Sequence, residues 1–346
     1  MMISVHIGKM KSLFLATTLA LSLTGCIYDK LDDCPRGCEV TFVYDRNMKH
    51  ADAAASEVRS VSLFAADADG RIVYRKASEY SASLGGSVSM DVSDIPSGKY
   101  KFVAWAEGEQ RNGDSYFHAD MNDVVSLEDL YRYIRNESGN VSHDLTPLFH
   151  GIVEDVDLTE IHDRRIKCKM SLTKNTNVFR VVLQQASGNM NPSDYRMEIT
   201  DDNAFMDWTN ALTLNGQSLG FGTDSLTYSP WSLSSGSTGI EGAISSKVDG
   251  GVNVVVAEFT TGRLVVGHKP ILSVYNVSDN RLVFRIPLVD YALLVKGNYN
   301  RKMDDQEYLD CQDEYNMTFF LDENGRWLNS SIVINSWVVV LNDVDI

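Results

Sequence analysis

Short stretches in which apolar and polar residues alternate recur along most of this chain, and they constrain its fold more than any other feature. In one stretch, Phe102 and Ala104 fall on one side of an extended chain and Trp105 falls on the other. A period of two is that of a β-strand, whose successive side chains point to opposite faces. The pattern predicts strands over residues 39–44, 61–65, 71–75, 99–106, 168–183, 252–259, 263–266, 271–275, 281–286, 317–321 and 332–341.

Turn sequences separate these predicted strands. Asp69-Gly70 and the IPSG segment at 95–98 each precede a strand, residues 260–262 connect a further hairpin, and the Ser/Gly-rich residues 232–242 suggest a long loop. Short strands joined by Gly, Pro and Asx turns favour a β-sandwich over alternating strands and helices. We therefore predict an all-β fold.

One segment departs from the alternation. From Leu127 to Ile134 the apolar residues recur at the i, i+3, i+4 and i+7 spacing of one helix face, and Ser126 with Asp129 forms a capping-box pattern. We predict one short amphipathic helix over residues 126–135, packed against a sheet.

The first 25 residues have the features of a secretory signal. Lys9 and Lys11 precede an apolar run over residues 12–23, which is too short to span a bilayer comfortably. The run ends in Leu23-Thr24-Gly25-Cys26, which resembles a bacterial lipobox. We predict cleavage between Gly25 and Cys26, followed by N-palmitoylation and S-diacylglycerol attachment at Cys26. An ordinary signal peptide with a chance cysteine is the alternative.

The rest of the chain is strongly acidic. The 346 residues carry a net charge of −16, and removing Lys9 and Lys11 with a leader that contains no acid leaves −18. Nucleic acid needs clustered Lys and Arg for its phosphates, so we expect no nucleic-acid partner. No later run is long and apolar enough to span a bilayer. The lipid is therefore the expected link to a membrane.

Four further cysteines follow Cys26, at Cys34, Cys38, Cys168 and Cys311. An exported protein meets oxidising conditions that permit disulfides, and four cysteines allow three pairings. These pairings and buried free thiols all stay open. No histidine lies at zinc-ligand spacing from Cys34 and Cys38, so we predict no metal site.

The chain divides into a signal peptide (1–25), a lipidated tether (26–38), an N-terminal half (39–165) and a C-terminal half (166–346). The boundary near residue 165 follows a polar stretch and precedes the strand expected near Cys168. Each half is long enough for one β-sandwich domain.

No catalytic constellation emerges from the sequence. Ser171 and Lys174 match Ser-x-x-Lys, but that chemistry needs a helix and two companion motifs that the chain lacks. His143 and His150 with Asp144 fit no zinc signature. No nucleophile elbow, phosphate loop or dinucleotide fingerprint occurs. We predict no enzymatic activity, no small-molecule substrate and no cofactor besides the covalent lipid.

The tryptophans leave a second function open. Aromatic side chains can stack on sugars, although most would fill the space between two sheets. A surface glycan-binding lipoprotein of a polysaccharide-uptake system is therefore the alternative. It expects exposed aromatics clustered on one face, and the candidates are Trp105, Trp208, Trp231, Trp327 and Trp337.

Several motifs occur in order over nearly the whole chain after the leader: Cys26, DDCP at 32–35, VYDRNM at 43–48, Asp52, PSGKY at 96–100, VAW at 103–105, LFHG at 148–151, SLTKNTN at 171–177, EYLD at 307–310, DEYNMTFFL at 313–321 and INSWVVV at 334–340. Together they resemble the fimbrium-anchoring outer-membrane lipoproteins of Bacteroidales type V pili, or fimbrillin-associated anchor proteins. Two positions depart from the family pattern, since Lys174 and Cys311 stand where the family often has Arg.

The resemblance implies two tandem transthyretin-like β-sandwich domains on a lipoprotein of the outer membrane. It implies a role in cell adhesion, in which the protein holds the base of a fimbria and takes part in its assembly or length control. Its partners would be shaft pilins, which polymerise by β-strand exchange, a form of β-augmentation. Acidic residues soon after Cys26, namely Asp29, Asp32 and Asp33, resemble signals that direct such lipoproteins to the cell exterior.

The C-terminal segment 332–341 is our candidate for a strand exchanged with a pilin. It is apolar, rich in β-branched residues and close to the end of the chain. The alternative is that it is simply the last core strand of the C-terminal half. The residues that would carry the exchange are Ile332, Ile334, Trp337, Val339 and Leu341.

Overall fold

The computed structural model describes residues 36–83, 85–111, 115–117, 121–136, 138–185, 190–214, 223–238, 252–297 and 300–340. The signal peptide lies outside these residues, as does the tether up to Pro35, which includes the predicted lipidation site Cys26 and Cys34. Leu341, the last of the candidate exchange residues, also lies outside them.

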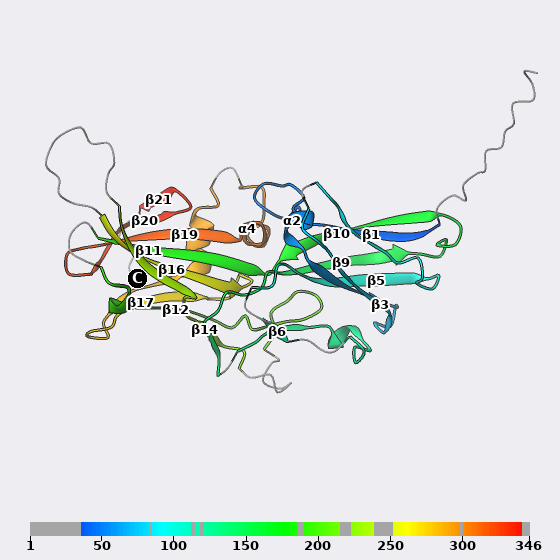
Figure 1. The fold of residues 1–346 in the computed structure, drawn as a ribbon, viewed down its shortest axis with the longest axis horizontal. Helices are drawn as coiled ribbons and strands as arrows, with labels where there is room; N and C mark the ends of the chain where they lie inside the picture. Colours follow the sequence, from blue (N-terminus) through cyan, green and yellow to red (C-terminus); the bar gives the residue numbers. More distant parts are fainter. Residues whose placement is uncertain are drawn as a thin grey trace, which may run out of the picture.

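A seven-stranded sheet forms one end of the molecule (Figure 1). Its order is β3 (Ile72–Glu79), β2 (Ser60–Ala66), β5 (Lys99–Glu107), β9 (Leu148–Asp157), β10 (Arg165–Lys174), β1 (Gly37–Val43) and β4 (Val88–Asp91). Strands β9 and β10 pair over only three positions, so the sheet folds over on itself there. Alternate side chains such as Phe42, Phe102 and Met170 fill the space between the two layers.

Two further sheets enclose a second core at the other end (Figure 1). One has the order β15 (Ser232–Thr238), β16 (Val252–Gly262), β11 (Thr176–Gln185), β19 (Glu314–Leu321), β20 (Trp327–Ile334) and β21 (Trp337–Val340). The facing sheet has the order β18 (Leu282–Pro287), β17 (Ile271–Asn276), β12 (Tyr195–Asp201), β14 (Leu226–Tyr228) and β8 (Asn140–Val141). The predicted all-β fold is thus confirmed.

Smaller elements complete the fold. A three-stranded sheet contains β13 (Phe205–Met206), β7 (Arg132–Ile134) and β6 (Tyr116–Phe117). The described helices are α2 (Ala54–Glu57), α3 (Leu288–Leu294), α4 (Asp305–Cys311) and the 3₁₀ turns η1 (Leu127–Asp129) and η2 (Pro192–Asp194). Over the described residues, none of these helices has the length and apolar character needed to cross a membrane.

A nearly continuous ribbon joins the two ends of the molecule, because only Asn175 separates β10 from β11. Strand β10 pairs in parallel with β1 in the first sheet, and β11 pairs in parallel with β19 in the second (Figure 1). The sheets therefore change at Asn175 rather than at the boundary that we placed near residue 165. Strands β7 and β8 of the N-terminal half also pair with β13 and β14 of the C-terminal half. The division into two domains stays a prediction.

The amphipathic helix predicted over residues 126–135 is wrong. The capping box of Ser126 and Asp129 forms, but it begins only the single 3₁₀ turn η1. Leu127 and Leu130 are buried on the outer side of strands β2 and β5, in a small cluster with Phe64 and Val103. The chain then becomes β7, which pairs on both sides with other strands, and this tertiary pairing overrides the helical spacing.

Three local strand assignments also need correction. Residues 263–266 form no strand, because β16 continues to Gly262 and pairs with β11 and β15 instead of folding back. The segment predicted as a loop begins with β15, which forms an edge of that sheet. The single strand predicted over 332–341 is two strands, β20 and β21, separated by Asn335 and Ser336.

Candidate functional site

The C-terminal hairpin is closed by a two-residue turn. Asn335 and Ser336 have φ angles of 48° and 72°, and positive φ at both central residues is the signature of a type I′ turn. Asn335 also holds the hairpin to β19, because its backbone N–H donates to the Asn316 carbonyl at 2.9 Å and its side-chain oxygen accepts from the Asn316 N–H at 2.8 Å. The turn is thus well defined.

The two strands of this hairpin are buried very differently. On β20, Ile332 and Ile334 are fully buried in the larger core, as expected of a core strand. On β21, Trp337 is 63% exposed, Val338 65% and Val340 67%. Val339 is partly buried and packs against the core. The exposed apolar part of the candidate exchange segment is therefore β21, and its exchange with a pilin stays a prediction.

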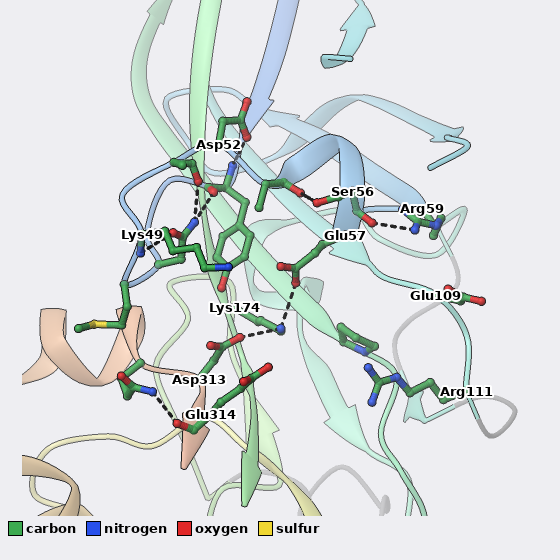
Figure 2. A pocket seen from close by; sticks show the side chains of 17 residues that line it. Lys49, Asp52, Ser56, Glu57, Arg59, Glu109, Arg111, Lys174, Asp313 and Glu314 are labelled. Carbon is green, nitrogen blue, oxygen red and sulfur yellow. Dashed lines mark hydrogen bonds and ion pairs between the residues drawn. The ribbon is translucent and has the colours of Figure 1, made fainter. Parts of the chain in front are cut away.

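A partly buried ion-pair cluster lies where the two ends of the molecule meet. Lys174, the last residue of β10, donates to Asp313 at 2.7 Å and to Glu57 at 3.0 Å (Figure 2). Glu57 ends helix α2, and Asp313 lies between α4 and β19. Burial alone would lower the pKa of Lys174, but the two carboxylates raise it above its ordinary value. The charged lysine therefore ties elements of both cores together.

A cavity of about 600 Å³ opens beside this cluster (Figure 2). Its wall carries charges of both signs, and Tyr44 lies within it with its ring edge-on to Phe149 at 5.2 Å. Burial, together with the nearby Asp313, raises the pKa of Tyr44. The charged residues around the cavity are Lys49, Asp52, Glu57, Arg59, Glu109, Arg111, Lys174, Asp313 and Glu314. The Ser56 hydroxyl in this lining donates to the Ala53 carbonyl at 2.9 Å rather than to a carboxylate.

Three of the residues tested for catalysis, Lys174, Asp144 and His150, have other partners. Lys174 is held by two carboxylates and is therefore not available as a base for Ser171. Asp144 pairs with Arg111 at 2.7 Å and accepts from Thr260 at 2.5 Å. His150 is buried and its Nε2 lies 2.9 Å from the Trp208 carbonyl, to which it can donate. No catalytic set arises among these residues.

The burial of His150 predicts a pH dependence of stability. Burial lowers its pKa to about 4, whereas a histidine in an unfolded chain titrates near 6.5. The unfolded chain therefore binds more protons between these values, and stability is lost as the pH falls through this range. Between pH 7 and pH 5, the free energy of unfolding should drop by about 2 kcal/mol more in the wild type than in His150→Gln.

Urea unfolding at both pH values measures this difference. The matched control is His162→Gln, which removes a histidine that is exposed rather than buried. An equal drop for the wild type and His150→Gln would contradict the role of His150.

The described cysteines are buried free thiols, at Cys38, Cys168 and Cys311. Burial raises the pKa of Cys38 to about 12 and that of Cys311 to about 11, so both thiols are neutral at physiological pH. No disulfide joins these three. Cys34 lies outside the described residues.

A cluster that the sequence did not indicate contains Asp201, Asp202 and His268. One ligand atom from each lies within 4.8 Å of the others, and this is the one group in the described ranges that could hold a metal ion. His268 Nδ1 lies 2.7 Å from the Asp202 carboxylate. The histidine is far from the aspartates in sequence, so no local spacing could have pointed to the cluster.

The tryptophans do not form an aromatic platform. Trp105 is buried, and Trp327 packs against Phe284 and Phe319 in the larger core. The exposed ones are Trp231 and Trp337, which lie next to β15 and on β21, at opposite edges of the six-stranded sheet. This separation weakens the glycan-binding alternative, which expects exposed aromatics gathered on one face.

Comparisons with known proteins agree with the motif resemblance. The minor fimbrium anchoring subunit Mfa2 of Porphyromonas gingivalis is 22% identical over 331 residues, which cover 92% of this chain and 90% of that protein. The solved structure of the fimbrial anchor protein Mfa2 from the same species has a TM-score of 0.62 at 20% identity, covering 89% of this chain and 100% of that one, and shows the shared fold.

A second solved structure is more similar. It is a candidate adhesin of Bacteroides thetaiotaomicron with 30% identity and a TM-score of 0.73, covering 90% of this chain and all of that chain. The model of the family described as fimbrillin-A associated anchor proteins Mfa1 and Mfa2 matches residues 31–343. The family predicted from the motifs is confirmed: this chain belongs to the fimbrillin-A associated anchor proteins.

Proposed function

We propose that this chain is an outer-membrane lipoprotein that holds the base of a fimbria at the cell surface. Its lipid would be carried by Cys26, only a short tether before β1 begins at Gly37. Its β-sheets would join a shaft pilin through β-strand pairing and so take part in assembly or length control. Membership of the fimbrial anchor family supports the fimbria-associated part of this role.

The observation that carries the proposal is a direct strand path between the two ends of the molecule. The path runs from β1 to its parallel neighbour β10, through Asn175 into β11, and from β11 through β19 and β20 to β21. The start of β1 and the hairpin of β20 and β21 lie toward opposite ends of the long axis (Figure 1). A membrane tether at one end and a filament at the other would therefore pull along the strands.

Tension applied in this way acts on the β1–β10 pair in shear. Gly37 pairs with Arg165, and the parallel register continues over seven positions to Val43 and Ser171. Because β1 would be pulled from its first residue and β10 from its last, the hydrogen bonds between them share the load. They would have to break together rather than one after another. This geometry suits a protein that must stay folded while it holds a filament.

Removing the last strand tests whether the exposed hairpin joins the pilin. A chain that ends at Asn335 keeps the buried Ile332 and Ile334 but loses β21. We expect it to fold, with a loss of about 1–2 kcal/mol because little apolar surface of β21 is buried, and to lose pilin binding by at least about tenfold.

Thermal melting and co-purification with the shaft pilin of the same bacterium measure the two effects. Unfolding of the truncated chain would support the core-strand alternative. If the truncated chain binds the pilin as well as the wild type does, β21 is not the strand that joins the pilin.

A further inference from the structure

The free edge of β21 differs from the sheet edges formed by β3 and β18. An edge strand presents unpaired backbone groups, and natural proteins commonly protect such edges with charges, prolines or irregular pairing. Edge strand β3 carries Arg75, Lys76 and Glu79, and edge strand β18 carries Arg285, ends at Pro287 and has a register shift against β17. Strand β21 has the sequence Trp-Val-Val-Val and no such protection.

The turn geometry determines which backbone groups of β21 face the open side. In a hairpin with a two-residue turn, the residues that flank the turn, Ile334 and Trp337, exchange both hydrogen bonds. Bonded and non-bonded pairs then alternate along the strands. Trp337 and Val339 therefore bond to β20, whereas Val338 and Val340 direct their N–H and C=O groups away from it. No described strand lies on that side.

A small hollow accompanies this edge. It has a volume of about 220 Å³, and Met48, Val295, Tyr308 and Trp337 contribute to its lining. Trp337 and Val339 lie on the core-facing side of β21, because they pair with the buried Ile334 and Ile332. A strand added beside β21 would direct alternate side chains toward the same side of the sheet. Backbone pairing at an open edge combined with a side-chain pocket is the arrangement of β-augmentation sites.

We propose that β21 stays in the sheet and accepts an extended strand of the shaft pilin at its free edge. The inference rests on the proposed function and adds its direction: this chain is an edge acceptor and does not give up β21. Donation of β20 is disfavoured because Ile332 and Ile334 are fully buried. The neutral edge fits an uncharged segment with apolar side chains at alternate positions. A second copy of this chain is the competing occupant, and the test below separates the two.

The decisive variant is Val338→Pro. Proline removes one N–H, and the Val338 N–H faces the open side, so the pairing of β20 with β21 should survive. The extended backbone of Trp337 also suits a residue that precedes proline. We expect the melting temperature to change by no more than about 3 °C and the affinity for the purified shaft pilin of the same bacterium to fall at least about tenfold.

Val338→Thr is the matched control. It keeps the N–H and the β-branched shape, so the affinity should stay within about threefold of the wild type. If Val338→Pro unfolds, Val340→Lys replaces it, because an edge lysine blocks strand addition without changing the backbone. Hydrogen exchange adds a direct readout: pilin should slow the exchange of the Val338 and Val340 amides.

Several results would overturn the inference. The first is that Val338→Pro and Val340→Lys bind the pilin with wild-type affinity. The second is that Val338→Thr loses as much pilin affinity as Val338→Pro, because the side chain rather than the backbone edge would then be the contact. The third is that pilin slows the hydrogen exchange of other amides but not of the Val338 and Val340 amides. A wild-type dimer that Val338→Pro dissociates, with pilin binding unchanged, would assign the edge to a second copy. In each case the wild type still binds pilin, whereas no binding by the wild type would refute the proposed function itself.

Discussion

Replacing Cys26 by Ala is expected to move this protein from the membrane fraction to the soluble fraction almost completely. Each buried methylene of an acyl chain contributes roughly 0.8 kcal/mol, and two or more chains give stable anchoring that one chain does not. The described residues include no helix that could take over this role. Fractionation of cells that express either form, followed by immunoblotting, measures the change.

Cys34→Ala is the control for this experiment. It removes a neighbouring thiol of the same tether and leaves the lipobox intact, so the protein should stay with the membrane. If Cys26→Ala also stayed there after a wash in high salt, a lipid on Cys26 could not be the anchor.

The second large effect is expected at Lys174. The variant Lys174→Met leaves the carboxylates of Glu57 and Asp313 facing each other without their shared cation. Breaking a fully buried ion pair costs 3–5 kcal/mol, and both carboxylates here keep partial contact with solvent, so we expect a loss of about 2–4 kcal/mol. Urea unfolding of the chain without its leader at pH 7 gives the free energy of unfolding.

Strand β10 offers a matched control at Lys169. This lysine pairs with Asp45 at 2.8 Å, but its side chain is 61% exposed, against 13% for Lys174. Exposed pairs contribute roughly 0–1 kcal/mol, so Lys169→Met should change stability by about that amount. Equal losses for the two variants would show that the cluster at Lys174 does not hold the junction.

The sequence predicted the strands well where the local pattern alone determines them. Alternation in residues 99–106 corresponds to β5, with Phe102 and Ala104 in one core and Trp105 in the other. The capping box at Ser126 also formed, but its helix did not. The strand β7 that replaces the helix is held by β6 and β13, and no local pattern reports pairing with such distant residues.

The C-terminal hairpin was missed for a related reason. Asn335-Ser336 lacks the glycine of the Asn-Gly signal that usually identifies a type I′ turn, so residues 332–341 resembled one apolar strand. The sequence also could not show which distant strands pair with each other. Strand β10 follows a polar stretch, so we assigned it to the C-terminal half, yet it pairs with β1 of the N-terminal half. The ion pairs of Lys174 and the cluster at His268 likewise depend on these long-range contacts.

The most direct test of the central claim follows the filaments rather than this protein. In the source bacterium, the amount of shaft pilin on washed cells is compared with the amount in the medium. The strains are the wild type, a strain that lacks this gene, and the same strain carrying either the wild-type or the Cys26→Ala form of the gene. Our account predicts that pilin moves to the medium without the gene, returns to the cells with the wild-type form, and stays in the medium with Cys26→Ala. Filaments that remain cell-bound in the strain lacking the gene would contradict it.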